Sequence, residues 1–376
     1  MKKLFTILAV AAALAFVSCD DGDDYQTGQS SGSIPDESEE LLPAKDGRVA
    51  IAYVTWYGKA IPDPTVMTHI CYAFAELYVR DGVYQGFKLQ GNEDRFRQVV
   101  ALKKKNPKLK ISLSFSHTVS NSDNSQGGGF SALAKSDEYR KAFAKDCRDF
   151  CSKWGIDGID IDWEFPGLSW SGHACDPSVD VENHVLLMKQ LRETLGTRYL
   201  LTYAGYGKDV IESSDGRKYI DIAGVDPYVD WVNIMTYDLD AAPNHQSALK
   251  DKSAYLDCDR AIKAYINAGV APSKMVLGIP FYGRHSFDGS PSAIDYNKII
   301  LLDKSIYKID NWDNDASVPY VTENGKYYCG YDNPKSIAIK GDWIRGLGMK
   351  GMMYWDYNAD DNKQTLCKAV WQAVMK

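Results

Sequence analysis

The stretch GIDGIDIDWEFPG (155–167) places four acidic side chains within eight positions: Asp157, Asp160, Asp162 and Glu164. Its apolar and β-branched residues predict a strand, in which side chains alternate between two faces. Asp160, Asp162 and Glu164 therefore share one face. Buried carboxyl groups must be hydrogen-bonded, paired or protonated, and such a cluster can hold a proton for acid–base catalysis. The structural alternative is an acid cluster that serves a cation or a hydrogen-bond network.

This strand belongs to an alternation of short apolar runs with longer amphipathic segments. The predicted strands are 49–55, 69–76, 109–116, 158–164, 199–205, 231–237, 275–281 and 350–356. Helical spacing of apolar residues is clearest in 137–154. Eight strands that alternate with helices predict a single α/β domain over residues 45–376, a (β/α)8 TIM barrel. The competing doubly wound sheet would normally show a Gly-rich turn after its first strand, and AYVTWYGKAIPD has none.

The barrel sets the direction in which the acids point. Ile159, Ile161 and Trp163 require the apolar helix layer, so the acids on the other face point into the barrel. Glu164 comes at the carboxyl end of its strand, where barrel enzymes carry their catalytic residues. Asp157 lies off the inward face at the start of the strand, so we expect it to hold the local backbone.

The segment DGIDIDWE resembles the DxxDxDxE motif of glycoside hydrolase family 18, the chitinase family. The resemblance continues through NIMTYD, which is similar to the family's MxYD motif, LGIPFYGR at strand seven, and GMKGMMYWD with the terminal tryptophan of strand eight. It covers roughly residues 48–375. It implies a retaining glycosidase in which the substrate's own acetamido group is the nucleophile. Neither a cofactor nor a metal is implied, and the six histidines are scattered without a metal-binding spacing.

The resemblance also implies catalytic roles. Glu164 protonates the glycosidic oxygen and then acts as a base toward water. Asp162 binds the acetamide N–H and stabilises an oxazolinium-like intermediate, and Asp160 shares a proton or hydrogen bond with Asp162. Tyr237 hydrogen-bonds the acetamido oxygen, and Asp238 helps to position the sugar.

Further residues are expected to bind substrate. Trp355 resembles the tryptophan that forms the floor of the sugar subsite, with ordinary barrel core as its alternative. Tyr53 and Phe74 fall at matching strand ends, with core packing as the alternative for both. Met235 belongs to the MxYD motif. Arg284 is expected to contact substrate or a neighbouring acid.

Two features depart from the family pattern. The third strand normally ends in SxGG, but here Ser114 is followed by Ser116 and His117 in place of both glycines, so the loop should approach the sugar differently. The segment 285–349 is short for the α+β insertion that many members carry, so we expect a reduced or absent insertion and a shallow, open cleft. Such a cleft favours endo-cleavage.

Acid catalysis by Glu164 requires that its carboxyl be protonated near neutral pH. Neighbouring carboxylates repel its charge, and this repulsion should raise its pKa. The acids are therefore expected to be crowded together for a functional reason.

The N-terminal segment reads as a targeting signal. MKK precedes a short apolar run that ends in FVSC, which resembles a bacterial lipobox, so residues 1–18 are expected to be a signal peptide and Cys19 a lipidated anchor. The alternative is an ordinary secretory signal. Residues 19–44 should form a disordered acidic linker. Together these features predict an exported lipoprotein at the outer membrane or cell surface.

The charge distribution narrows the choice of partners. Residues 1–44 carry eight acids and two lysines, a net charge of −6, which leaves about −1 of the total −7 for residues 45–376. A nearly neutral domain has no basic field for nucleic acid. We expect a monomer that binds an N-acetylglucosamine-containing glycan or chitooligosaccharide.

Three functions fit the sequence. The first is an endo-acting chitinase that cleaves β-1,4 bonds between N-acetylglucosamine units. The second is an endo-β-N-acetylglucosaminidase that releases N-glycans, and the WEFP and FYGR contexts favour the chitinase over it. The third is a chitinase-like lectin without catalytic activity. Such lectins usually lose the acid at the position of Glu164, which is present here.

Overall fold

The structure, a computed structural model, describes residues 40–117, 129–168, 174–208 and 218–376. The predicted signal peptide, Cys19 and most of the predicted linker lie outside these residues. Among the described residues, no helix combines the length and apolarity needed to cross a bilayer.

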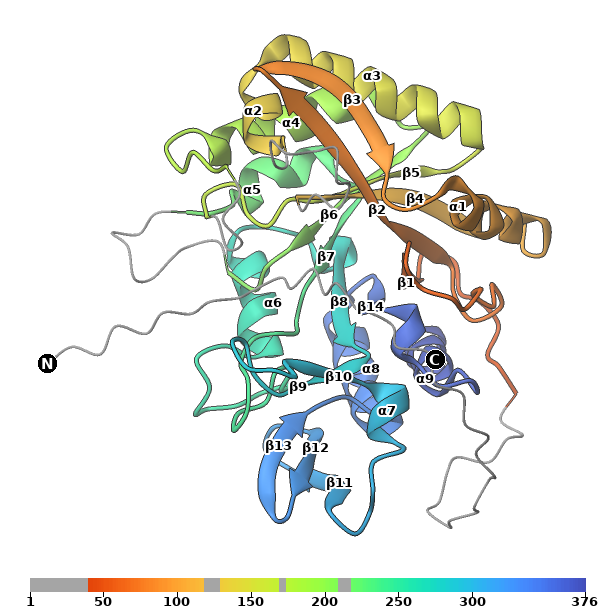
Figure 1. Cartoon of the computed structure of the whole chain (residues 1–376), viewed down its shortest axis with the longest axis vertical. Coiled ribbons are helices and arrows are strands. Elements are labelled where there is room, and N and C mark those ends of the chain that lie inside the picture. Colours follow the sequence, from red (N-terminus) through yellow and green to blue (C-terminus); the bar gives the residue numbers. More distant parts are fainter. Residues whose placement is uncertain (1–39, 118–128, 169–173, 209–217) are drawn as a thin grey trace, which may run out of the picture.

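Eight parallel strands close into a barrel with helices around it, so the predicted (β/α)8 fold is confirmed (Figure 1). In barrel order the strands are β1 (Val49–Thr55), β2 (His69–Arg80), β4 (Lys110–Ser116), β5 (Gly158–Asp162), β6 (Leu200–Gly205), β7 (Trp231–Ile234), β8 (Met275–Pro280) and β14 (Gly351–Trp355). The β1–β2 pairing completes the ring. β5 and β7 end two and three residues earlier than predicted, so Glu164, Tyr237 and Asp238 lie in the segments that follow strand ends.

The helices pack on the outer face of the barrel. They are α1 (Glu93–Val100), α2 (Phe130–Lys135), α3 (Asp137–Trp154), α4 (Asp180–Leu195), α5 (Ile222–Val225), α6 (Cys258–Asn267), α8 (Pro334–Leu347) and α9 (Thr365–Met375). Helix α3 shows how the sequence sets their bounds. Ser136 caps its first turn, Gly155 ends it in the left-handed region at φ 64°, and Phe143, Cys147 and Cys151 on its inner side are buried.

Two additions to the barrel were not predicted as strands. Strand β3 (Val83–Leu89) returns antiparallel to the extended end of β2. Residues 282–330 form a five-stranded antiparallel sheet of β9 (Tyr282–Arg284), β10 (Ala293–Asp295), β11 (Tyr307–Asp313), β12 (Val318–Glu323) and β13 (Lys326–Gly330), with the short helix α7 (Tyr296–Ile299). The insertion is therefore a small folded sheet, seen in the lower part of Figure 1.

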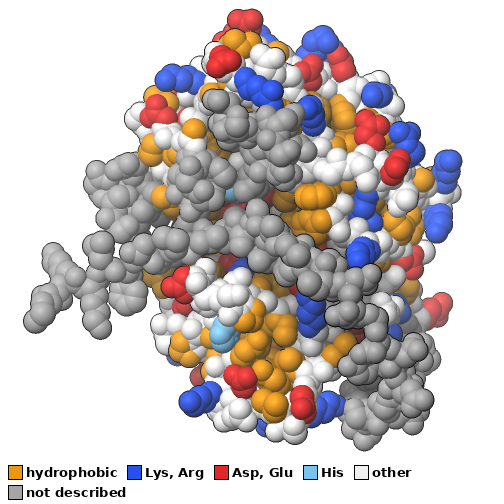
Figure 2. All heavy atoms as spheres, in the orientation of Figure 1, with side chains coloured by type: hydrophobic (Ala, Val, Ile, Leu, Met, Phe, Trp, Pro, Cys, Tyr) orange, Lys and Arg blue, Asp and Glu red, His pale blue; other side chains and the backbone are white. Residues whose placement is uncertain are grey.

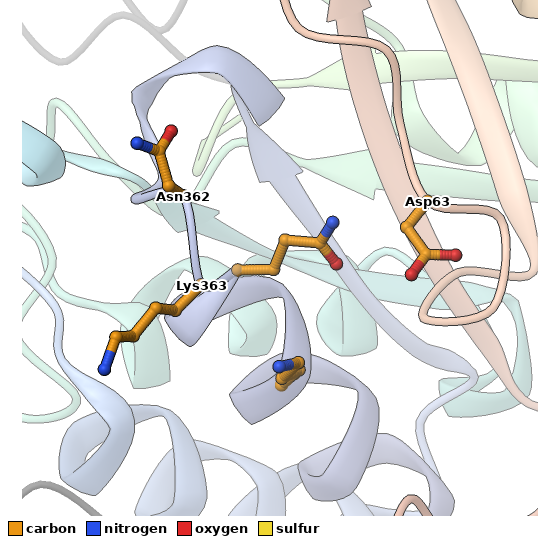
Figure 3. Close-up of a pocket in the computed structure, with 5 residues that line it drawn as sticks. Asp63, Asn362 and Lys363 are labelled. Carbon is orange, nitrogen blue, oxygen red and sulfur yellow. The ribbon is translucent and has the colours of Figure 1, made fainter. Parts of the chain in front are cut away.

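Charged side chains of both signs are interspersed over the upper part of the face in Figure 2. A surface pocket of about 390 Å³ lies beside the loop between β14 and α9 (Figure 3). Its lining residues are Asp63, Asn362, Lys363, Gln364 and Lys368. None of the candidate catalytic residues lines this pocket, so it is separate from the acid cluster.

Candidate active site

Asp160 lies at the centre of a polar network inside the barrel. Strand register places it opposite Ser114 of β4 and Thr202 of β6. Its Oδ2 accepts hydrogen bonds from Tyr53 at 2.9 Å and Ser114 at 2.7 Å. Its Oδ1 accepts from Thr202 at 2.6 Å and Asn233 at 3.2 Å. Burial raises the pKa of Asp160, and these four hydrogen bonds act against that rise.

Asp162 pairs with Glu164. The Asp162 carboxyl hydrogen-bonds to Glu164, which raises the pKa of Asp162 and lowers that of Glu164. Burial, the charge of Glu164 and that of Asp160 add to the rise for Asp162, whose pKa lies well above its usual range. In this hydrogen bond Asp162 is the donor and Glu164 the acceptor, because it favours the proton on Asp162. Among the described residues, Asp162 Oδ1 has no hydrogen-bond partner.

The pKa of Glu164 is raised to about 7, as acid catalysis requires, but the cause differs from the one expected. Burial of the carboxyl is the largest cause, and the charge of Asp238 is the second. The hydrogen bond from Asp162 acts in the opposite direction. The charge that raises this pKa thus comes from a residue 74 positions away in sequence rather than from the acidic strand itself.

Asp238 is paired with a cation on the inserted sheet. Arg284 at the end of β9 donates to both carboxylate oxygens of Asp238, from Nε at 2.8 Å and from Nη2 at 2.7 Å. Tyr282 hydrogen-bonds both of these residues. Of the two partners predicted for Arg284, substrate or a neighbouring acid, the structure supplies an acid. The insertion therefore reaches the candidate site through this ion pair.

Tyr237 lies near the same carboxyl groups. Burial and the charges of Asp162, Glu164 and Asp238 are among the causes that raise its pKa, so its phenol is un-ionised and can donate a hydrogen bond. Gly278 on β8 leaves room for the ring, since a Cβ there would lie 2.8 Å from Tyr237 Cε1.

Trp355 forms an aromatic group with Phe74 and Tyr53. Its ring stacks on Phe74 with centroids 5.6 Å apart and planes 20° from parallel, and lies 5.8 Å from the ring of Tyr53. Trp355 and Phe74 are half-buried, whereas Tyr53 is fully buried and bonded to Asp160. Trp355 and Phe74 thus keep accessible aromatic surface, while Tyr53 belongs to the network beneath the acids. Non-proline cis peptides follow Ala73, Glu164 and Trp355.

The remaining predicted residues have simpler surroundings. Met235 is buried after β7, and its amide donates to the Gly205 carbonyl at 2.8 Å. Ser116 pairs in register with Asp162, and the His117 amide donates to the Asp162 carbonyl at 3.1 Å, so the altered loop lies directly against the acidic strand. Asp157 holds the backbone as expected, because its Oδ2 accepts from the Ile111 amide at 2.9 Å.

Sequence reasoning missed three polar residues of this site. Thr202 and Asn233 bond Asp160, and Tyr282 bonds the Asp238–Arg284 pair. Thr202 and Asn233 could have been found, because each is a polar residue within a strand buried on both faces, where an inward polar group needs a partner. Among the described residues, no group of three or more His, Cys, Asp or Glu side chains could hold a metal ion. The geometry thus offers an acid whose pKa is raised to about 7, a buried carboxyl pair and an aromatic surface.

Comparison with known proteins assigns the chain to a family. The sequence profile of the glycosyl hydrolases family 18 matches residues 49–360. Chitinase A1 of Niallia circulans is 31% identical over 318 residues, which cover 71% of this chain but only 43% of that protein. Chitotriosidase-1 of Mus musculus is 27% identical over 342 residues, which cover 81% of this chain and 69% of that protein.

Solved structures agree with this assignment. A class V chitinase of Nicotiana tobaccum superposes with a TM-score of 0.74 at 25% identity, covering 87% of this chain and 98% of that one. A family 18 N-acetylglucosaminidase of Paenibacillus barengoltzii gives a TM-score of 0.71 at 26% identity, covering 87% and 99%. The chain is a glycoside hydrolase and belongs to family 18 of the glycosyl hydrolases.

Proposed function

We propose that this protein is an endo-acting, retaining chitinase that cleaves β-1,4 bonds between N-acetylglucosamine units through an oxazolinium intermediate. The observation that carries the proposal is the buried carboxyl pair, in which the pKa of Asp162 lies well above its usual range and that of Glu164 is raised to about 7. Chitinases among the relatives support chitin as the substrate class.

Glu164, Asp162 and Tyr237 have different roles in the proposed reaction. Glu164, protonated below neutral pH, donates its proton to the glycosidic oxygen. The acetamido oxygen of the sugar forms the new bond to the anomeric carbon, while Asp162 Oδ1 accepts the acetamide N–H and Tyr237 donates to the acetamido oxygen. Glu164 then removes a proton from water, which opens the oxazolinium ring with retention.

Asp238 and Trp355 serve the substrate in different ways. Asp238, fixed by Arg284, presents its carboxylate beside the acid pair and keeps the pKa of Glu164 high. The half-buried ring of Trp355, supported by Phe74, offers a flat face to the apolar C–H surface of a pyranose. Endo-cleavage follows from the small insertion, which we propose leaves the cleft open at both ends.

The test is mass-spectrometric product analysis with chitooligosaccharides and, separately, with an N-glycoprotein, using wild type and Glu164→Gln. Short oligomers from wild type alone would support the chitinase. Glu164→Gln should lower kcat by more than about 10²-fold, because it keeps the shape of the side chain but cannot supply the proton. Free glycans with intact chitooligosaccharides would replace the proposal with N-glycan release, and cleavage of neither would favour a glycan-binding protein.

We also propose that Cys19 is lipidated and anchors the enzyme at the outer membrane or cell surface. The lipobox-like FVSC and the acidic, Ser/Gly-rich residues 20–44 support this. Expression of the full chain in a Gram-negative host with labelled palmitate should give a labelled protein in the detergent phase, and Cys19→Ser should be unlabelled. Equal labelling of both proteins would contradict the anchor.

A further inference from the structure

The four groups that donate to Asp160 are not equivalent. Tyr53, Ser114 and Thr202 present hydroxyl groups, which can donate to a carboxylate or accept from a carboxylic acid. Asn233 presents an amide nitrogen, which can only donate. The hydroxyl groups therefore tolerate either protonation state of Asp160, whereas Asn233 favours the ionised one.

The orientation of the Asn233 amide is set by Trp231. The indole Nε1 donates to Asn233 Oδ1 at 3.0 Å, and an indole N–H cannot accept a hydrogen bond. The oxygen of the amide must therefore face Trp231, and its nitrogen must face Asp160. The same Nδ2 also donates to the Tyr53 oxygen at 3.1 Å, which leaves the Tyr53 proton directed at Asp160 Oδ2.

Both residues are placed to act on the site without touching substrate. Asn233 is fully buried, and Trp231 is 5% exposed at the start of β7, the end of the barrel opposite the catalytic groups. His69 packs edge-on against the indole with centroids 5.2 Å apart. His69 thus holds the indole at this end of the barrel. The hydrogen bonds from Trp231 to Asn233 and from Asn233 to Asp160 lead from there through the barrel interior toward Asp162.

We propose that Asn233, oriented by Trp231, is a positioning residue that holds Asp160 ionised and thereby leaves the proton of the acid cluster with Asp162 and Glu164. This inference rests on the proposed catalytic roles of the acids. The titratable groups that interact electrostatically with Asp160 are Tyr53 from β1, Cys71 from β2 and Asp162 from β5. None of these three is a cation, so hydrogen-bond donors carry the stabilisation of the Asp160 charge against them.

The first test compares the pH dependence of kcat/KM for wild type, Asn233→Leu and Trp231→Phe on chitooligosaccharides. Asn233→Leu removes the obligate donor at similar volume and should raise the pKa of Asp160. The acidic limb of the kcat/KM profile should therefore move to higher pH by about one to two units, because hydrogen bonds to charged groups are the stronger class. Trp231→Phe keeps the ring but frees the amide to flip, so it should move the limb in the same direction by less.

The matched control is Trp371→Phe on α9, which also deletes one indole hydrogen bond, to the Leu42 carbonyl at 2.8 Å, but lies outside this network. Its limb should stay at the wild-type position. A limb for Trp231→Phe that overlaps wild type would overturn the proposal, even if Asn233→Leu failed to fold.

A second test requires no substrate and separates this inference from the proposed function. Asn233 lowers the pKa of Asp160 in the folded protein, so its contribution to stability is present at neutral pH and lost as pH falls through that pKa. The Tm difference between wild type and Trp231→Phe should therefore be larger at pH 7.5 than at pH 4, and the difference for Trp371→Phe should not change. A pH-independent difference for Trp231→Phe would overturn the inference even if wild type were an active chitinase. The expected dependence in a protein that cleaves no chitooligosaccharide would support the inference and reject the substrate.

Discussion

The Asp238–Arg284 pair should set the pH above which the enzyme loses activity, because it controls the pKa of Glu164. Asp238 is the charge that raises the pKa of Glu164, and Arg284 neutralises part of that charge through two hydrogen bonds. Asp238→Asn removes a negative charge and leaves a cation nearby, so it should lower the pKa of Glu164. Arg284→Met leaves Asp238 uncompensated, so it should raise that pKa.

The size of the expected change in activity follows from the pKa of Glu164. With a pKa of about 7, about half of the Glu164 side chains are protonated at pH 7. Burial is the larger cause of the rise and persists in both variants, and Asp238 is 31% exposed, so screening reduces its effect. We therefore expect shifts of about one pH unit in either direction. For Asp238→Asn, about a tenth of the enzyme would then be protonated at pH 7, an extra loss of about fivefold.

The assay is kcat/KM against pH with a fluorogenic chitooligosaccharide, because this ratio reports the free enzyme. Both variants will also lose activity at every pH if Asp238 positions the sugar. The readout is therefore the pH at which the basic limb falls, and not the maximal value of kcat/KM. Basic limbs that coincide with wild type in both variants, or that move in the same direction, would refute the electrostatic reasoning.

Two other perturbations test different parts of the structure. Trp355→Ala should raise KM for chitooligosaccharides about threefold to tenfold with a smaller change in kcat, because it removes a stacking face and no acid. Steady-state kinetics on oligomers of two lengths measures this change. An unchanged KM would contradict the role of Trp355 in a sugar subsite. Lys340→Met should lower the free energy of unfolding by about 3–5 kcal/mol in urea titrations, because Lys340 and Asp332 form a fully buried pair at 2.8 Å and the variant leaves a buried carboxylate without its cation. The double variant Lys340→Met/Asp332→Leu should recover part of that loss, and no recovery would argue that volume rather than charge explains it.

The barrel was predictable because its signal is local. Each barrel strand is a short apolar run, and the helix spacing of 137–154 is visible in any window of that length. The inserted sheet was not recognised because its strands mix polar and aromatic residues and pair with one another rather than with the barrel. β3 was missed for a similar reason: VYQGFKL contains a glycine and mixes polar with apolar residues instead of forming a continuous apolar run.

The candidate site was predictable in its members but not in its electrostatics. The spacing of Asp160, Asp162 and Glu164 on one face follows from strand geometry alone. The contact of Asp238 with Arg284, 46 positions apart, depends on how the insertion packs on the barrel. Likewise, the order of causes behind the Glu164 pKa depends on burial, which only the folded chain defines.

Substrate assistance is the central claim, and the stereochemistry and substrate requirement of cleavage test it most directly. Proton NMR should follow the first minutes of hydrolysis of chitohexaose and of its fully de-N-acetylated counterpart. The account predicts that chitohexaose yields the β-anomer first and that the deacetylated hexamer is not cleaved, because it has no acetamido oxygen to act as nucleophile. Initial release of the α-anomer, or cleavage of the deacetylated hexamer at a comparable rate, would contradict it.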